Sequence, residues 1–153
     1  MCRGIGRNQM TIRILVMGLP GSGKTTLSDK LEESLTGQGF TISRFNADKV
    51  RKVYDDWDFS EAGRIRQSER MRRFADKSMA DVVLCDFIAP LPVMREKFDA
   101  DLTVWVDTVT ECKYDDTNKM FAAPDKYDFR VTEKDADKWS KVITSAIKRR
   151  IRR

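Results

Sequence analysis

The sequence contains no histidine, so any proton transfer must use a carboxylate, a lysine, a tyrosine or water. No apolar run approaches the ~20 residues that a membrane span needs, and residues 1–10 lack the apolar core of a secretory signal. We therefore expect no membrane-spanning segment and a loose N-terminal extension over residues 1–10. The three cysteines are an odd number without paired spacing, which argues against a disulfide framework or a zinc site and favours a reducing cytoplasm.

Composition is that of one globular domain. The chain has 153 residues, of which 41% are hydrophobic and 35% charged. Its net charge of +5 is concentrated in "RIRQSERMRR" and in the final "KRRIRR". Basic clusters attract phosphates, but a solvated helix end explains the C-terminal cluster better than a nucleic-acid contact does. Most arginines and aspartates of residues 55–73 are likewise interpreted as a solvated helix face.

Apolar runs alternate with helical patterns along the chain, which predicts a parallel sheet in a doubly wound α/β fold. The expected strands are "IRILVMG", "FTISRFNA", "DVVLCDFI", "DLTVWVD" and "YDFRVTE". The expected helices cover 24–36, a short segment from Asp48, 60–79, 91–98, 109–120 and 134–149. Ligands of such sheets bind at the carboxyl ends of strands, so functional residues should follow the first three strands.

The segment "GLPGSGKT", Gly18 to Thr25, matches the phosphate-binding pattern G-x-x-x-x-G-K-[ST] between a strand and a helix. It predicts a P-loop NTPase fold, with three α/β/α layers around a mainly parallel five-stranded sheet, over residues 11–153. We expect this loop to bind a nucleoside triphosphate together with Mg²⁺. The predicted phosphate-binding residues are Gly18, Pro20, Gly21, Ser22, Gly23, Lys24, Thr25 and Thr26.

Acidic residues follow the second and third predicted strands. Asp86 ends "VVLCD" and, with Thr25, is the candidate Mg²⁺ site, although an aspartate there also suits helix capping or a salt bridge. Asp48 and Arg51 lie one helical turn apart in "FNADKVR". Asp48 can orient or deprotonate an attacking hydroxyl, or else cap a helix, and Arg51 can bind phosphate. Lys24, Asp48 and Arg51 are the predicted catalytic residues.

From about Ile12 to Asp107 the chain resembles the adenylylsulfate kinases, which phosphorylate the 3′-hydroxyl of adenosine 5′-phosphosulfate with ATP. "GLPGSGKTT" is similar to their GLSGSGKST, "NADKVR" to D-G-D-N-V-R, "DFSEAGRIRQ" to a G-F-S-x-x-x-R segment, and "FIAP" to F-I-S-P. The resemblance implies that kinase activity, and it implies the possibility of a homodimer. The acceptor-binding residues it implies are Asp48, Arg51, Phe59, Arg64, Gln67, Phe87 and Ile88.

The chain also departs from the family pattern. Asn46, which cannot take a proton, stands at the position of the first acid of D-G-D. Asp86 stands where the family usually has a small residue. The basic lid of the family is shortened here to "KYDDTNKMFAAPDKYDF". Lys113 and Lys119 are candidate substitutes for the lid cations, and Phe121 either provides a stacking surface or packs on the core.

Two alternatives stay open. "NADKVR" is also similar to the N-R-D-D-Y-R segment of 5′-hydroxyl polynucleotide kinases, which implies a kinase acting on nucleic acid through the basic segment 64–73 and the C-terminal tail. A non-catalytic nucleotide-binding protein is the third possibility. The Phe59, Arg64 and Gln67 set suits a pocket for one nucleotide better than a strand-tracking groove.

Overall fold

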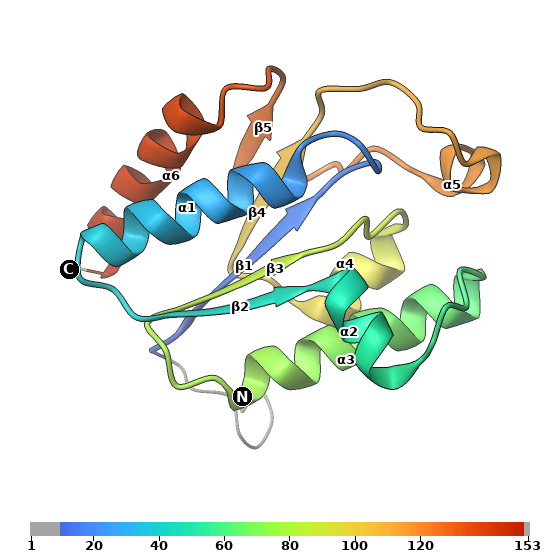
Figure 1. The fold of residues 1–153 in the computed structure, drawn as a ribbon, viewed down its shortest axis with the longest axis horizontal. Coiled ribbons are helices and arrows are strands. Elements are labelled where there is room, and N and C mark those ends of the chain that lie inside the picture. Colours follow the sequence, from blue (N-terminus) through green and yellow to red (C-terminus); the bar gives the residue numbers. More distant parts are fainter. Residues whose placement is uncertain (1–9, 152–153) are drawn as a thin grey trace.

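The structure is a computed structural model that describes residues 10–151 (Figure 1). Its sheet contains five strands, and all four neighbouring pairs are parallel in the order β2-β3-β1-β4-β5. The strands are β1 (Ile12–Met17), β2 (Ile42–Asn46), β3 (Val82–Asp86), β4 (Leu102–Val106) and β5 (Phe129–Val131). The predicted α/β P-loop NTPase fold is therefore confirmed, and the described sheet is wholly parallel.

Helices cover both faces of the sheet and give three layers, as Figure 1 shows. Side chains of β1 alternate between two cores, with Ile14 and Val16 packed in the core under α1 and α6, and Leu15 and Met17 in the core under α3 and α4. The helices are α1 (Lys24–Gly37), α2 (Ala47–Tyr54), α3 (Glu61–Lys77), α4 (Pro92–Phe98), α5 (Asp115–Met120) and α6 (Ala136–Ile151). None of the helices within residues 10–151 has the length and hydrophobicity to span a membrane.

One predicted helix is wrong in its first half. The sequence predicts a helix over 109–120, but α5 begins only at Asp115. The hydroxyl of Thr108 donates to the Ser22 carbonyl at 2.6 Å, and the Asn118 side chain bonds both the N–H and the carbonyl of Cys112. These contacts hold residues 108–114 as a loop. Tertiary contacts thus override the local helical pattern.

The start of α3 agrees with its local signal. Ser60 caps α3, because its hydroxyl accepts a hydrogen bond from the Gly63 N–H at 3.1 Å.

Cys85 is buried in the core as a free thiol, whereas Cys112 is half-buried and free. The third cysteine, Cys2, lies outside the described residues, as do residues 1–9 of the predicted extension and residues 152–153 of the basic tail.

Candidate active site

The phosphate loop, Gly18–Thr25, joins β1 to α1 and depends on glycine for its shape. Gly18 has φ 147°, and a Cβ there would lie 2.3 Å from the Val106 carbonyl oxygen. Gly23 has φ 100° and is the N-cap residue immediately before α1. An L side chain is strained at both positions. The loop therefore presents backbone N–H groups at the N-terminus of a fourteen-residue helix, an arrangement that binds anions.

Lys24 lies inside the cavity that this loop borders. Its Nζ donates to the Leu19 carbonyl oxygen at 3.0 Å. Burial lowers the pKa of Lys24 to about 8, and the nearby carboxylates of Asp86 and Asp48 only partly oppose this effect. An ammonium in such a site gains from any anion brought next to it, because the anion replaces the lost hydration.

Thr25 and Asp86 meet at the junction of α1 and β3. The Thr25 hydroxyl donates to Asp86 Oδ2 at 3.1 Å, and Arg44 Nε donates to Asp86 Oδ1 at 3.3 Å. Arg44 also pairs with Asp29 and Glu32 on α1. Asp86 is therefore salt-bridged but caps no helix, since α4 begins at Pro92. A hydroxyl beside a carboxylate is an oxygen donor set that fits Mg²⁺ bound together with phosphates.

Asp48 lies in the first turn of α2 and does not cap the helix. Asn46 is the cap, because its Oδ1 accepts a hydrogen bond from the Lys49 N–H at 3.2 Å. The capping interpretation of Asp48 is thereby wrong. The exposed Asp48 side chain lines the cavity and is close enough to Lys24 and Arg51 to oppose in part the burial that lowers the pKa of each. Its carboxylate is free to face an acceptor.

Arg51, Phe59 and Arg64 form one wall of the cavity. The Arg51 guanidinium lies over the Phe59 ring, 4.4 Å from its centroid, and Arg64 lies 5.4 Å from the same centroid. Arg51 Nη1 also donates to the carbonyls of Asp56 and Asp58, at 3.0 and 3.1 Å. Burial lowers the pKa of both arginines. Within residues 10–151 neither arginine has a carboxylate partner at hydrogen-bond distance, which leaves the pair suited to an anionic ligand.

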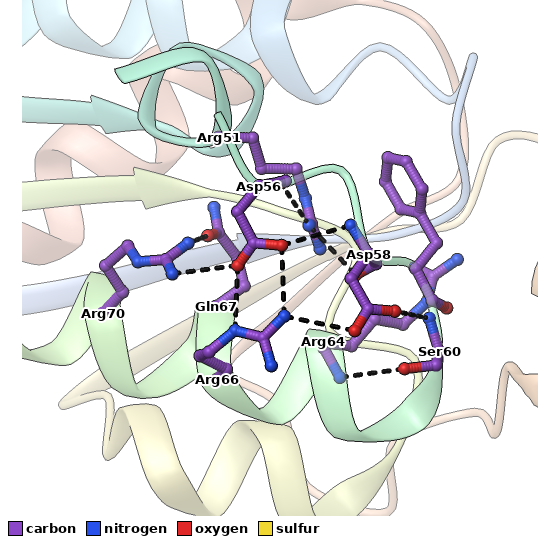
Figure 2. A network of polar contacts seen from close by, with 10 residues as sticks. Arg51, Asp56, Asp58, Ser60, Arg64, Arg66, Gln67 and Arg70 are labelled. Atoms are coloured by element: carbon purple, nitrogen blue, oxygen red, sulfur yellow. Dashed lines mark hydrogen bonds and ion pairs between the residues drawn. The ribbon is translucent and has the colours of Figure 1, made fainter. Parts of the chain in front are cut away.

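A polar network fixes the segment between α2 and α3 that carries Phe59 (Figure 2). Asp56 accepts hydrogen bonds from Arg66 and from Arg70, whose Nη2 lies 2.9 Å from Asp56 Oδ2. Arg70 Nη1 donates to Gln67 Oε1, and Gln67 Nε2 donates to the Ala47 carbonyl. Arg70 is buried, so its interpretation as part of a solvated face is wrong. Gln67 supports the wall through α2.

Most of these groups border one cavity of about 740 Å³, whereas Arg44, Asp56, Arg66 and Arg70 lie behind its lining. Of the predicted site residues, the phosphate-loop members except Gly18, both metal candidates and all seven acceptor candidates line it. Lys113, Lys119 and Phe121 are not among the lining residues. Phe121 packs on the core beneath the Arg95 guanidinium, 5.6 Å from its ring centroid, so it is no stacking surface.

Sequence reasoning missed several lining residues. Lys134 follows β5, and its Nζ donates to the Gly21 carbonyl at 3.0 Å. The rule that ligands bind at the carboxyl ends of strands could have found it. Thr117 is buried and accepts a hydrogen bond from Arg64 Nη2 at 2.8 Å. No signal in the sequence marks that contact. The loop over residues 108–114 and the helix α5 contribute further lining residues: Thr108, Tyr114 and Asp116.

Comparisons with known proteins agree with this fold. The solved structure of the Mycobacterium tuberculosis APS kinase CysC in complex with AMPPNP and APS matches 92% of this chain and 99% of its own, with a TM-score of 0.74 and 19% identity. That likeness concerns the fold. The bifunctional enzyme NodQ of Azospirillum brasilense is 34% identical over 116 residues, which cover 69% of this chain but 18% of NodQ.

The adenylyl-sulfate kinase of Halothermothrix orenii is 30% identical over 127 residues, which cover 76% of this chain and 67% of that enzyme. The model of the adenylylsulphate kinase family matches residues 10–126, well over half of the chain. Because this family model covers more than half of the chain, this chain belongs to the adenylylsulphate kinase family.

Proposed function

We propose that this chain transfers the γ-phosphoryl group of ATP to the 3′-hydroxyl of adenosine 5′-phosphosulfate. The observation that carries the proposal is that one cavity holds both the phosphate loop and an aromatic and cationic wall made of Arg51, Phe59 and Arg64. Family membership supports the same substrates. Phosphoryl transfer depends mainly on positioning and charge neutralisation, which a single cavity with these groups supplies.

On the donor side, the loop N–H groups and Lys24 hold the ATP phosphates. Thr25 and Asp86 would hold Mg²⁺, which when bound neutralises charge on the β- and γ-phosphates. Lys134, next to Gly21, adds a cation at the edge of the loop. The loop, Lys24 and Lys134 thus counter the charge that builds up during transfer.

On the acceptor side, Phe59 offers a ring on which a purine stacks, and Arg51 and Arg64 attract the phosphosulfate group. Asp48 orients the 3′-hydroxyl and accepts its proton. The acceptor oxygen then forms a bond to the γ-phosphorus as the bond from that phosphorus to the β,γ-bridging oxygen breaks, and ADP leaves with the electron pair. Gln67 of α3 holds α2 in place behind this wall through its hydrogen bond to the Ala47 carbonyl.

The nucleic-acid alternative is less well supported by the surface of α3. Its arginines are largely engaged within the chain: Arg66 and Arg70 pair with Asp56, and Arg72 lies 3.8 Å from Asp76. A polynucleotide track needs cations that are available to successive phosphates. A small nucleotide needs only the wall inside the cavity. A homodimer and a cytoplasmic location stay predictions, the first testable by light scattering of the purified chain.

A transfer assay with labelled ATP tests the proposal directly. The acceptors offered are adenosine 5′-phosphosulfate, mononucleosides and 5′-hydroxyl oligonucleotides, and the Lys24→Ala variant is the control for contaminating kinases. We expect label on the phosphosulfate alone. Transfer to the oligonucleotide would establish the alternative instead, and no transfer to any acceptor by a chain that binds ATP would support a non-catalytic protein.

A further inference from the structure

Asn46 touches both halves of the site with one side chain. Its Nδ2 donates to Asp86 Oδ2 at 2.8 Å, and this is the same carboxylate oxygen that accepts the Thr25 hydroxyl. Its Oδ1 accepts the Lys49 N–H at the start of α2, the helix that carries Asp48 and Arg51. The donor side and the acceptor side therefore meet at one half-buried amide.

The position of this amide follows from the register of the sheet. Asn46 and Asp86 are paired residues at the carboxyl ends of the neighbouring parallel strands β2 and β3. A carboxylate opposite Asp86 would face it with like charge, and an alkyl group would leave its oxygen without this donor. An amide also has the acceptor that the first turn of α2 needs. Of the ordinary side chains of this length, only asparagine meets both demands.

We propose that Asn46 is a positioning residue that aims the Asp86 carboxylate at the metal side of the cavity and, through a separate hydrogen bond, fixes the start of α2. The proposal rests on the function proposed above, and it gives Asn46 a role of its own, although the residue cannot act as a base. Arg44 holds the other oxygen of the Asp86 carboxylate, because its Nε donates a hydrogen bond to Oδ1.

Two substitutions separate the two hydrogen bonds. Asn46→Ser keeps a cap acceptor for the Lys49 N–H but has no amide to reach Asp86. Asn46→Ala removes both contacts. The matched readouts are Mn²⁺ binding to the complex with a non-hydrolysable ATP analogue, followed by electron paramagnetic resonance, and hydrogen exchange at the Lys49 amide. Neither readout requires an acceptor or turnover, so failure of the proposed function would not be mistaken for failure of this inference.

We expect Mn²⁺ affinity to fall about tenfold in both variants, because loss of a hydrogen-bond partner of a metal-binding group typically costs that much or more. Exchange at Lys49 should rise about fivefold in Asn46→Ala, the size of a lost cap, and stay close to wild type in Asn46→Ser. In an Asp86→Ala background Asn46→Ser should cost no further Mn²⁺ affinity, since the two residues act as one unit.

Three results would overturn the inference. One is wild-type Mn²⁺ binding by Asn46→Ser. A second is an equal loss from Asn46→Ser with and without Asp86, which would mean that Asn46 acts independently. The third is an unchanged Lys49 exchange rate in Asn46→Ala. Circular dichroism and thermal melting of each variant verify that the comparison is made on folded protein.

Discussion

The Arg51 guanidinium lies 4.4 Å from the centroid of the Phe59 ring and at the same time donates to two carbonyls of the segment that carries this ring. One side chain of α2 therefore places the aromatic face and its own charge together. A planar guanidinium with several donors can do both, whereas an ammonium on a flexible stem cannot. The acceptor wall depends on arginine chemistry as well as on positive charge.

We predict that Arg51→Lys raises the KM for the acceptor about tenfold and leaves the KM for ATP unchanged, because the charge remains but the stacking and the two carbonyl contacts are lost. Initial-rate kinetics with each substrate varied in turn provide the measurement. The exposed neighbour Lys52, changed to alanine, is the control. An equal rise in both KM values would show that Arg51 supports the fold generally and does not form the acceptor wall.

Asp56 gives a second prediction, about the segment between α2 and α3. Hydrogen bonds from Arg66 and Arg70 hold the pKa of Asp56 well below its ordinary value near 3.8. A lowered folded pKa means that the ionised carboxylate stabilises the fold above the ordinary value, and that this contribution is lost as the pH falls below it. Asp56→Asn should therefore lower the melting temperature at neutral pH, and the difference from wild type should shrink below about pH 4.

Thermal melts at several pH values check this prediction. Asp55→Asn is a matched control, because Asp55 is an exposed neighbour with φ 50°, a conformation that asparagine also tolerates. A difference between Asp56→Asn and wild type that stays constant with pH would contradict the role of the ionised carboxylate.

The features that could be predicted from the sequence are those set by residues close together in the chain. The phosphate loop, the cap at Ser60 and the acid at the end of β3 follow from residues close together in the chain, and the structure has them where the patterns predict. The loop over residues 108–114 depends on a hydrogen bond from Thr108 to Ser22, and the place of Lys134 depends on a contact with Gly21. Both contacts span long stretches of sequence, so no local pattern reports them.

Asn46 illustrates the same limit at a single residue. In the sequence it is a position where a family acid is absent, and this suggests a lost function. In the structure the register of β2 and β3 sets it against Asp86, where a second acid would be repelled. The physical meaning of the substitution becomes visible only when both strand ends are known.

A third prediction separates the role of the Asp48 carboxylate from that of the Asn46 amide. With Mg²⁺ and acceptor both saturating, Asp48→Asn should lower kcat by about 100-fold or more, since a positioned base contributes about that much. Asn46→Ala should lower kcat far less under the same conditions, because saturation offsets weaker metal and acceptor binding. Steady-state kinetics on the two variants decide the matter. The reverse order of effects would remove Asp48 from its role as base.

The fourth prediction concerns Lys24, whose ammonium lies buried in the phosphate site. Burial lowers its pKa to about 8, so above that pH the nucleotide-free protein increasingly presents a neutral amine to the phosphates. The Kd for ATP should rise as the pH increases through about 8, by up to about tenfold per pH unit. Isothermal titration calorimetry across this range measures it, and Lys24→Ala should bind ATP weakly without the inflection.

The same shift predicts the opposite trend for stability. Between about pH 8 and the ordinary lysine value of 10.5 the unfolded chain binds more protons than the folded one, so the Lys24 contribution to the free energy of unfolding rises with pH. Denaturant titrations of wild type and Lys24→Ala without nucleotide isolate that contribution, because the other lysines are common to both. If ATP binding weakens while the stability of wild type rises relative to Lys24→Ala, the pH effect lies in the site itself. A parallel loss of binding and stability would instead trace it to unfolding.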